Sequence, residues 1–167
     1  LVLTAPGIPM LLQGQELLED GYFSDTDPVD WSRLGAFGGI HDLYRELIRL
    51  RHDGYDNTAG LKGRNVNVHH VNDVDKVIAY HRWDQGGPGD DVVVVLNWAN
   101  RGYSSYNLGF PRGGTWYVRF NSDWSGYDGS FGSWNSYNTT ASYGPRDGMS
   151  YNANVGIGPY TCIILSQ

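Results

Sequence analysis

Short runs of β-branched and aromatic residues, separated by turn residues, fill much of the chain after Gly60 and constrain its fold more than any other feature. The run from Val92 to Trp98 is nearly all aliphatic and is bounded by turn residues, which is typical of a strand buried on both faces. Similar runs occur at 66–69, 76–83, 116–120 and 160–165. Several short strands at turn-punctuated intervals predict an antiparallel β-sandwich.

The segment 121–154 differs in composition from the strands around it. It is rich in Ser, Gly, Asn, Asp and Tyr, contains few aliphatic residues, and includes Trp124 and Trp134. Small polar residues favour turns and loops, because their side chains hydrogen-bond to nearby backbone. We therefore expect a long, locally packed loop with at most one short hairpin.

A short apolar run near the N-terminus, from Ala5 to Glu16, is bracketed by prolines and ends in polar residues. This pattern is typical of a buried strand, which needs hydrogen-bonding neighbours for its backbone. Only Leu1 to Thr4 precede the run, so it has nothing upstream to pair with. We therefore expect this chain to be the C-terminal part of a larger protein.

The strongest helical signal follows a polar loop rich in Asp and Glu. Apolar residues at helical spacing form one stripe, made up of Ile40, Leu43, Tyr44, Leu47 and Ile48. Two pairs have the spacing of weak surface ion pairs, Asp42 with Arg45 and Glu46 with Arg49. Gly54 is a plausible C-terminal cap, so the helix is expected to end just before it.

Composition limits the classes of partner. Hydrophobic residues make up 40% of the chain, which is enough for a packed core, and the formal net charge is −6. No Lys/Arg cluster is present, so neither nucleic acid nor an anionic membrane is an expected partner. No apolar run approaches the roughly 20 residues needed to span a bilayer. The single cysteine, Cys162, excludes an internal disulfide and is expected to be a small buried apolar residue.

Several segments occur in an order found in one enzyme family. They are Pro6–Met10 with Gly14-Gln15-Glu16, Asp27–Trp31, Leu43–Arg51, Asp75–Arg82 with Val94–Asn97, and Gly114–Asp123 with Tyr127–Ser130. In this order they resemble the C-terminal portion of the α-amylase family of glycoside hydrolases and transferases, with 1,4-α-glucan branching enzymes as the most similar subgroup. The chain departs from the family at Val29, where leucine is usual, and in the longer loop after Asp123. The loop from Glu16 to Trp31 also lacks several features of bacterial branching enzymes.

The resemblance implies a mainly β fold with two parts. Residues 1–54 would be the last strand, loop and helix of a (β/α)8 catalytic barrel, and residues 55–167 an antiparallel C-terminal β-sandwich. The family uses three carboxylates on earlier barrel strands, the last of them within an Asn-His-Asp motif, for retaining chemistry. No such motif occurs in this chain, since Ile40-His41-Asp42 lies on the predicted helix. We therefore expect no catalytic residue here, and no activity from this chain alone.

The implied partners are an α-1,4-glucan such as glycogen or starch and the upstream barrel of the same polypeptide. Aromatic rings stack well on the apolar faces of sugars, so we select as candidate contacts Trp124, Tyr127, Trp134, Tyr137 and Tyr143. The alternative is that these rings fold back and fix the loop to the sandwich. Gln15 and Glu16 would lie near the active-site face of the complete barrel and support it. By contrast, we expect three tryptophans to pack in the core, namely Trp83, Trp98 and Trp116.

No metal site or cofactor is expected. His69 and His70 are adjacent in a predicted strand, so they should point to opposite faces and could not chelate one ion together. Glu16 and the nearby aspartates are more simply a solvated acidic loop than a catalytic pair, because nothing fixes their separation. The glycines around Pro88 lie between strands and form a turn rather than a phosphate loop.

Two other functions are compatible with the sequence. One is an α-amylase hydrolase tail, and the other is a free-standing carbohydrate-binding module. A third possibility is a purely structural sandwich without a ligand. The compartment is open: cytoplasm or a plastid-like compartment fits a branching enzyme, whereas secretion fits an amylase. The sequon Asn138-Thr139-Thr140 matters only in the secreted case.

Overall fold

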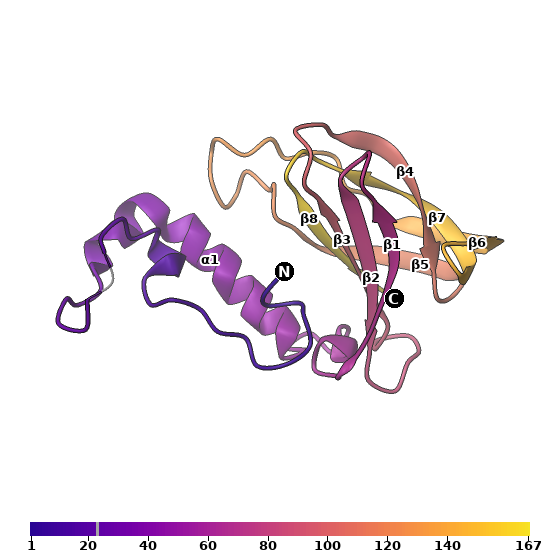
Figure 1. The fold of residues 1–167 in the computed structure, drawn as a ribbon, viewed down its shortest axis with the longest axis horizontal. Coiled ribbons are helices and arrows are strands. Elements are labelled where there is room, and N and C mark those ends of the chain that lie inside the picture. Colours follow the sequence, from indigo (N-terminus) through magenta and orange to yellow (C-terminus); the bar gives the residue numbers. More distant parts are fainter. Residues whose placement is uncertain (23) are drawn as a thin grey trace.

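A computed structural model describes residues 1–22 and 24–167 as a long helix beside a twisted, mainly antiparallel β-structure (Figure 1). The helical elements are η1 (Gln15–Leu17), η2 (Trp31–Arg33), α1 (Leu34–Arg51) and η3 (Ala59–Leu61). The strands are β1 (Asn65–Asn72), β2 (Val77–Trp83), β3 (Val92–Asn97), β4 (Tyr103–Phe110), β5 (Gly114–Asn121), β6 (Thr139–Arg146), β7 (Met149–Ile157) and β8 (Cys162–Ser166). In the described residues, no helix is both long and apolar enough to cross a membrane.

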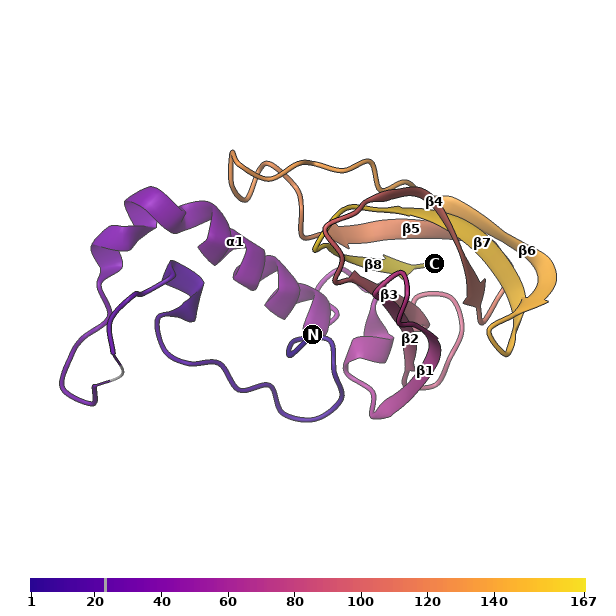
Figure 2. The same ribbon diagram turned by 45° about the horizontal axis from the view of Figure 1, so that its top comes forward.

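The eight strands form one antiparallel sheet in the order β1-β2-β3-β8-β5-β6-β7-β4. The sheet folds over on itself, so that β4 and β7 lie across from β2, β3 and β8 (Figure 2). The prediction of an antiparallel sandwich is therefore confirmed.

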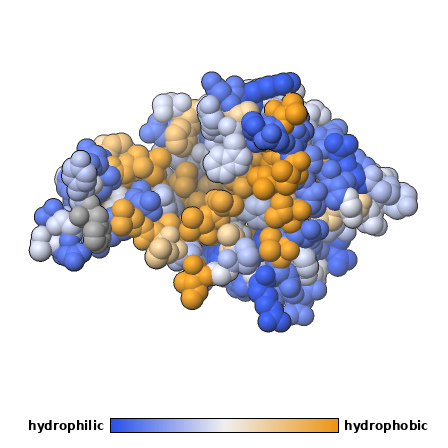
Figure 3. All heavy atoms as spheres, viewed as in Figure 1, coloured by the Kyte–Doolittle hydropathy of each residue, from blue (hydrophilic) through white to orange (hydrophobic). Residues whose placement is uncertain are grey.

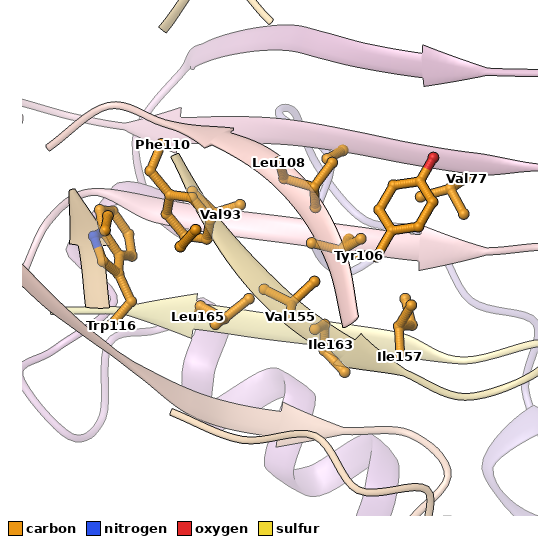
Figure 4. Close-up of a cluster of buried hydrophobic side chains, with 14 residues drawn as sticks. Val77, Val93, Tyr106, Leu108, Phe110, Trp116, Val155, Ile157, Ile163 and Leu165 are labelled. Carbon is orange, nitrogen blue, oxygen red and sulfur yellow. The ribbon is translucent and has the colours of Figure 1, made fainter. Parts of the chain in front are cut away.

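The first core fills the space between the two layers. Val93 and Leu165 of one layer face Phe110 and Val155 of the other, and all four side chains are fully buried (Figure 4). Trp116 lies at one end of this core, with its ring edge-on to Phe110 at a centroid distance of 5.1 Å. Such aromatic pairs add roughly 0.5–1.5 kcal/mol to the area that they bury.

A second core lies between the outer face of the sheet and α1. Successive β3 residues point to opposite faces, so Val93 enters the first core while Val94 enters the second. Leu50 of α1 is 1% exposed and packs in this second core, where Leu43 and Leu47 also contact it. Both faces of β3 are therefore covered, as its apolar composition predicts.

The predicted helix is confirmed, but its apolar stripe divides in two. Leu43, Leu47 and Leu50 face the sheet, whereas Ile48 is 42% exposed. Of the two expected ion pairs, the first is present: an Arg45 guanidinium nitrogen lies 2.9 Å from an Asp42 carboxylate oxygen. Arg49 and Glu46 are instead joined through the Tyr55 hydroxyl, at 2.9 and 3.0 Å respectively.

The helix ends with a left-handed residue, as many helices do. That residue is Asp53, with φ at 58°, rather than the expected Gly54. The backbone N–H of Asp53 donates to the Leu50 carbonyl at 3.0 Å, and the N–H of Gly54 to the Arg49 carbonyl at 2.9 Å. These two backbone hydrogen bonds together form a Schellman motif. The Asp53 carboxylate also accepts from the Thr58 N–H at 2.8 Å, which fixes the turn toward η3.

The prediction of a strand over 5–16 is wrong. The segment has no strand in the described structure, and Ile8 and Met10 are 98% and 87% exposed. Among the strands that the structure describes, none pairs with this segment, so its backbone has no ladder partner there. Side chains hold its start instead: Arg51 donates to carbonyls from Leu3 to Gly7, and the buried Arg82 donates to the Thr4 carbonyl.

Residues 121–154 were expected to form a long loop with at most one short hairpin; a hairpin is present, but it is long and occupies the segment from residue 139 onward. β6 and β7 form a long hairpin whose two-residue turn, Asp147-Gly148, has φ values of 54° and 75°. Positive φ at both positions is the hairpin turn that Asp-Gly favours. β4 was also not expected, although Tyr106, Leu108 and Phe110 alternate as buried residues in it.

The three tryptophans expected in the core lie in different places. Trp116 is fully buried, which confirms the prediction, but Trp98 is 57% exposed because it follows the end of β3. Trp83 is half-buried and stacks on His81, with ring centroids 4.5 Å apart. Cys162 is half-buried against the second core, and burial raises the pKa of its thiol to about 11.

Candidate functional site

The segment between β5 and β6, residues 122–138, is an ordered loop that reaches from the sandwich toward α1 (Figures 1 and 2). The Asp123 carboxylate organises it by accepting from the backbone N–H groups of Gly132 and Trp134, both at 2.8 Å. Ser125 N–H donates to the Ser133 hydroxyl at 2.7 Å, which joins the two sides of the loop. These bonds satisfy backbone donors that a loose loop would leave to water.

Two of the five candidate aromatic residues fold back against β4. The Trp134 indole N–H donates to the Tyr103 carbonyl at 3.3 Å, and its ring lies so close to Gly102 that a Cβ there would fall 2.6 Å from it. The Tyr137 hydroxyl donates to the Ser104 carbonyl at 3.0 Å. These contacts match the alternative in which the rings fix the loop to the sandwich.

Tyr143 lies elsewhere, on β6, and is 78% exposed. Its ring meets Tyr151 edge-on at 6.2 Å, on the neighbouring strand β7. The structure therefore does not bring Tyr143 together with the aromatic residues of the 122–138 loop.

Trp124 and Tyr127 do lie together, at a groove between the loop and α1. The groove has a volume of about 570 Å³. Its lining comes from three segments that are far apart in the sequence: Asp42, Arg45, Glu46 and Arg49 of α1, Val118 to Asn121 of β5, and Trp124 and Tyr127 of the loop. Nothing in the sequence pattern indicates that the α1 charges lie beside these rings.

The loop meets the helix at a glycine. A Cβ built on Gly39 of α1 would lie 2.0 Å from the carbonyl oxygen of Tyr127. Only a residue without a side chain allows this approach of the two backbones. The contact therefore requires the glycine at position 39, but the sequence alone does not show which segment approaches it.

The rings at the groove are supported on their inner side. Tyr127 packs on Phe120 at 5.8 Å and meets Trp124 edge-on at 5.0 Å. Burial, together with the nearby Glu46, Tyr55 and Asp42, raises the pKa of Tyr127 to about 12. Its hydroxyl therefore stays protonated at neutral pH and keeps a proton to donate. Trp124 is 55% exposed, so one part of its indole faces solvent.

Gln15 and Glu16 lie in η1, away from this groove. The Gln15 side chain accepts from the Leu12 N–H at 3.0 Å, which is a local turn contact. Gln15 also borders an apolar pocket of about 550 Å³ between the N-terminal segment, α1 and the sheet, together with Leu43, Phe120 and Cys162. Figure 3 shows apolar side chains gathered over this region of the molecule.

The acidic loop is used for local structure. Asp30 caps η2 by accepting from the Ser32 N–H at 3.0 Å, and hydrogen bonds from Ser32 lower the pKa of its carboxyl. Asp20 lies 3.4 Å from Arg33. In the described residues, no group of three or more His, Cys, Asp or Glu side chains could hold a metal ion.

The prediction that His69 and His70 point to opposite faces does not hold. A bulge in β1 places His69 between the paired residues Val68 and His70, which breaks the alternation of the strand. His70 contacts the Asp147 carboxylate at 3.1 Å and the Tyr106 hydroxyl at 3.0 Å. His69 is also close enough to Asp147 for that carboxylate to affect its pKa, although burial has the larger effect and lowers it.

Comparisons with known proteins agree with this architecture. Residues 68–167 match the family model described as "Alpha amylase, C-terminal all-beta domain". The crystal structure of the alpha-amylase from H.orenii superposes with a TM-score of 0.57 at 17% identity, and covers 99% of this chain and 33% of that one. This similarity concerns the fold alone.

Sequence relatives include two bacterial proteins named 1,4-alpha-glucan branching enzyme GlgB. The protein from Bradyrhizobium sp. (strain ORS 278) is 32% identical over 134 residues, which are 75% of this chain and 18% of the relative. The protein from Dechloromonas aromatica (strain RCB) is 29% identical over 171 aligned residues, covering 97% of this chain and 26% of the relative. This chain thus spans only about a fifth to a quarter of the length of these relatives.

The fold is an all-β sandwich domain preceded by a long helix. More particularly, the chain belongs to the α-amylase C-terminal all-β domain family. The family resemblance inferred from the sequence is therefore confirmed.

Proposed function

We propose that this chain is the C-terminal part of an α-glucan-acting enzyme whose complete form carries out 1,4-α-glucan branching. The observation that carries the proposal is the extent of the similarity to branching enzymes. It covers 97% of this chain for the Dechloromonas relative, and so includes α1 and the N-terminal segment as well as the sandwich. The family model alone matches only residues 68–167.

In this proposal, residues 1–54 are the end of a catalytic barrel and residues 55–167 are the C-terminal domain. Two features support the division of roles. α1 presents Leu43, Leu47 and Leu50 to the sheet, which fixes the sandwich to the helix. The exposed Ile48 and the apolar pocket beside Leu12 leave a second apolar face, which the rest of the barrel would cover.

The chemistry then belongs to the rest of the enzyme. Retaining glycoside chemistry needs a nucleophilic carboxylate and an acid that protonates the leaving oxygen. In the branching reaction one α-1,4 bond breaks and one α-1,6 bond forms, so the number of reducing ends is conserved. The role of this chain is to stabilise the barrel through α1 and to hold substrate at a distance from the reaction.

The test uses the full-length product of the gene that encodes this chain, incubated with amylose. Branching should lower iodine absorbance while reducing ends stay constant until a debranching hydrolase is added. A rise in reducing ends that accompanies the loss of iodine colour would support hydrolysis instead. No change in either signal would contradict both reactions.

The isolated chain is the control for this assay. It should leave iodine absorbance and reducing ends unchanged, because the proposal places every catalytic carboxylate outside it. Turnover of amylose by the isolated chain would refute this division of roles.

A further inference from the structure

The groove between α1 and the 122–138 loop has the physical character of a carbohydrate site. It combines the exposed indole of Trp124, the hydroxyl of the half-buried Tyr127 and charged groups of both signs around a space of about 570 Å³. Ligand sites are typically concave and use a few convergent polar groups to orient what they bind.

The indole of Trp124 is held in place before any ligand arrives. A Cβ added at Gly126 would lie 2.4 Å from the ring, so one side of the indole rests on the backbone of that glycine. Tyr127 supports its edge at 5.0 Å, and Asp123 fixes the loop through two backbone hydrogen bonds. A rigid ring loses little conformational entropy on binding, which favours affinity.

The polar side of the groove offers both donors and acceptors. Asp42 supplies a carboxylate that is half-exposed and paired with Arg45, and Glu46 supplies a second one. Arg49 and Arg119 supply guanidinium donors, while the protonated Tyr127 hydroxyl has no hydrogen-bond partner among the residues that the structure describes. A sugar hydroxyl both donates and accepts, so it can use groups of each kind.

We infer that this groove binds a segment of α-1,4-glucan, with Trp124 stacking on the apolar face of one glucose unit and Asp42 of α1 accepting from its hydroxyls. The inference rests on the proposed function for the identity of the sugar. Three arginines and two carboxylates line the groove, so it lacks the one-signed field that recruits a polyanion. An apolar helix is equally unsuited, since four charged side chains of α1 line one wall.

Affinity electrophoresis of the 167-residue chain through gels that contain glycogen tests the site. The unmodified chain should be retarded, and Trp124→Ala should weaken the apparent affinity by about tenfold or more, as loss of a central aromatic contact does. Trp98→Ala is the matched control, since Trp98 is 57% exposed but lies outside the groove. It should leave the affinity unchanged.

A second pair of variants tests the helix wall independently of the loop. Asp42→Ala removes the acceptor and an i,i+3 ion pair, and should weaken glycogen affinity by at least about threefold. Asp73→Ala also removes an i,i+3 pair, that with Lys76, but at the β1–β2 turn. It should have no effect. Unchanged melting temperatures would show that all four variants are folded.

Four results would overturn the inference: no retardation of the unmodified chain, equal retardation in hydroxyethyl cellulose, unchanged retardation of Trp124→Ala, or an effect of Trp124→Ala without one of Asp42→Ala. Each is distinguishable from failure of the proposed function. If the full-length enzyme acts on amylose and the groove variants bind glycogen normally, only the groove is refuted. If the full-length enzyme leaves amylose unchanged, the proposed function fails whatever the gels show.

Discussion

Truncation of Leu50 tests whether α1 is an integral part of the folded domain. The Leu50 side chain is 1% exposed and lies between α1 and the outer face of the sheet, beside Leu61 and Val94. Its carbonyl also accepts from the Thr58 hydroxyl at 2.8 Å, which fixes the backbone on the far side of the helix end. The site is therefore held on both sides and cannot collapse freely. Leu50→Ala should lower the free energy of unfolding by about 3 kcal/mol, within the range for fully buried leucines.

Urea unfolding of the isolated chain, followed by circular dichroism at 222 nm and by near-ultraviolet tryptophan signals, measures this loss. With a slope of about 2 kcal/mol per molar urea, the midpoint should fall by about 1.5 M, with coincident transitions from the two signals. Ile48→Ala is the control on the same helix, because Ile48 is 42% exposed, and its midpoint should change by less than about 0.5 M. Equal shifts for the two variants would refute the second core, as would a separate helical transition at low urea.

Three further predictions concern the hairpin, the helix and the half-buried His69. Gly148→Ala should destabilise the chain by about 1 kcal/mol, because φ at 75° strains a residue with a Cβ although no atom blocks it; no loss in thermal melts would contradict the turn geometry. Gly35→Ala in α1, where a Cβ also meets nothing, should instead stabilise by about 0.5 kcal/mol, and destabilisation would argue against a helix there. Burial lowers the pKa of His69 from 6.5 in the folded chain, so the unfolded chain takes up the proton first as the pH falls. The free energy of unfolding should therefore fall below about pH 6.5, and less so in His69→Asn; parallel pH profiles would show that His69 is not responsible.

The sequence alone predicts those elements whose buried residues follow a regular pattern along the chain. Val92 to Leu96 are buried on both faces of β3, and a continuous β-branched run is the pattern that this requires. The amphipathic spacing of α1 likewise predicts a helix, because one side must face the sheet. In both cases a local pattern follows directly from a tertiary requirement.

Elements that depend on their neighbours could not be predicted in this way. β6 contains Gly144 and Pro145 and has Ala141 as its one buried residue, so its strand form comes from pairing with β5 and β7. The 5–16 segment shows the reverse case, since an apolar run without a neighbouring strand stays irregular. Its apolar composition is therefore not sufficient to form a strand.

The candidate site also contains some residues that the sequence could predict and others that it could not. The exposed Trp124 could be selected from its polar, turn-rich surroundings, but Trp134 in the same segment folds onto β4. The contribution of Asp42 and its neighbours was not predictable, because the charges of a helix face are usually solvated. The close approach of Gly39 to Tyr127 brings that face to the loop.

Amide hydrogen exchange of the isolated chain, read by mass spectrometry, tests most directly whether helix and sandwich form one cooperative unit. Amides from Leu43 to Leu50 should exchange at the slow, global rate of β3 and β8, since the same second core protects all three elements. Exchange of the helix that is orders of magnitude faster than that of the two strands would contradict this prediction.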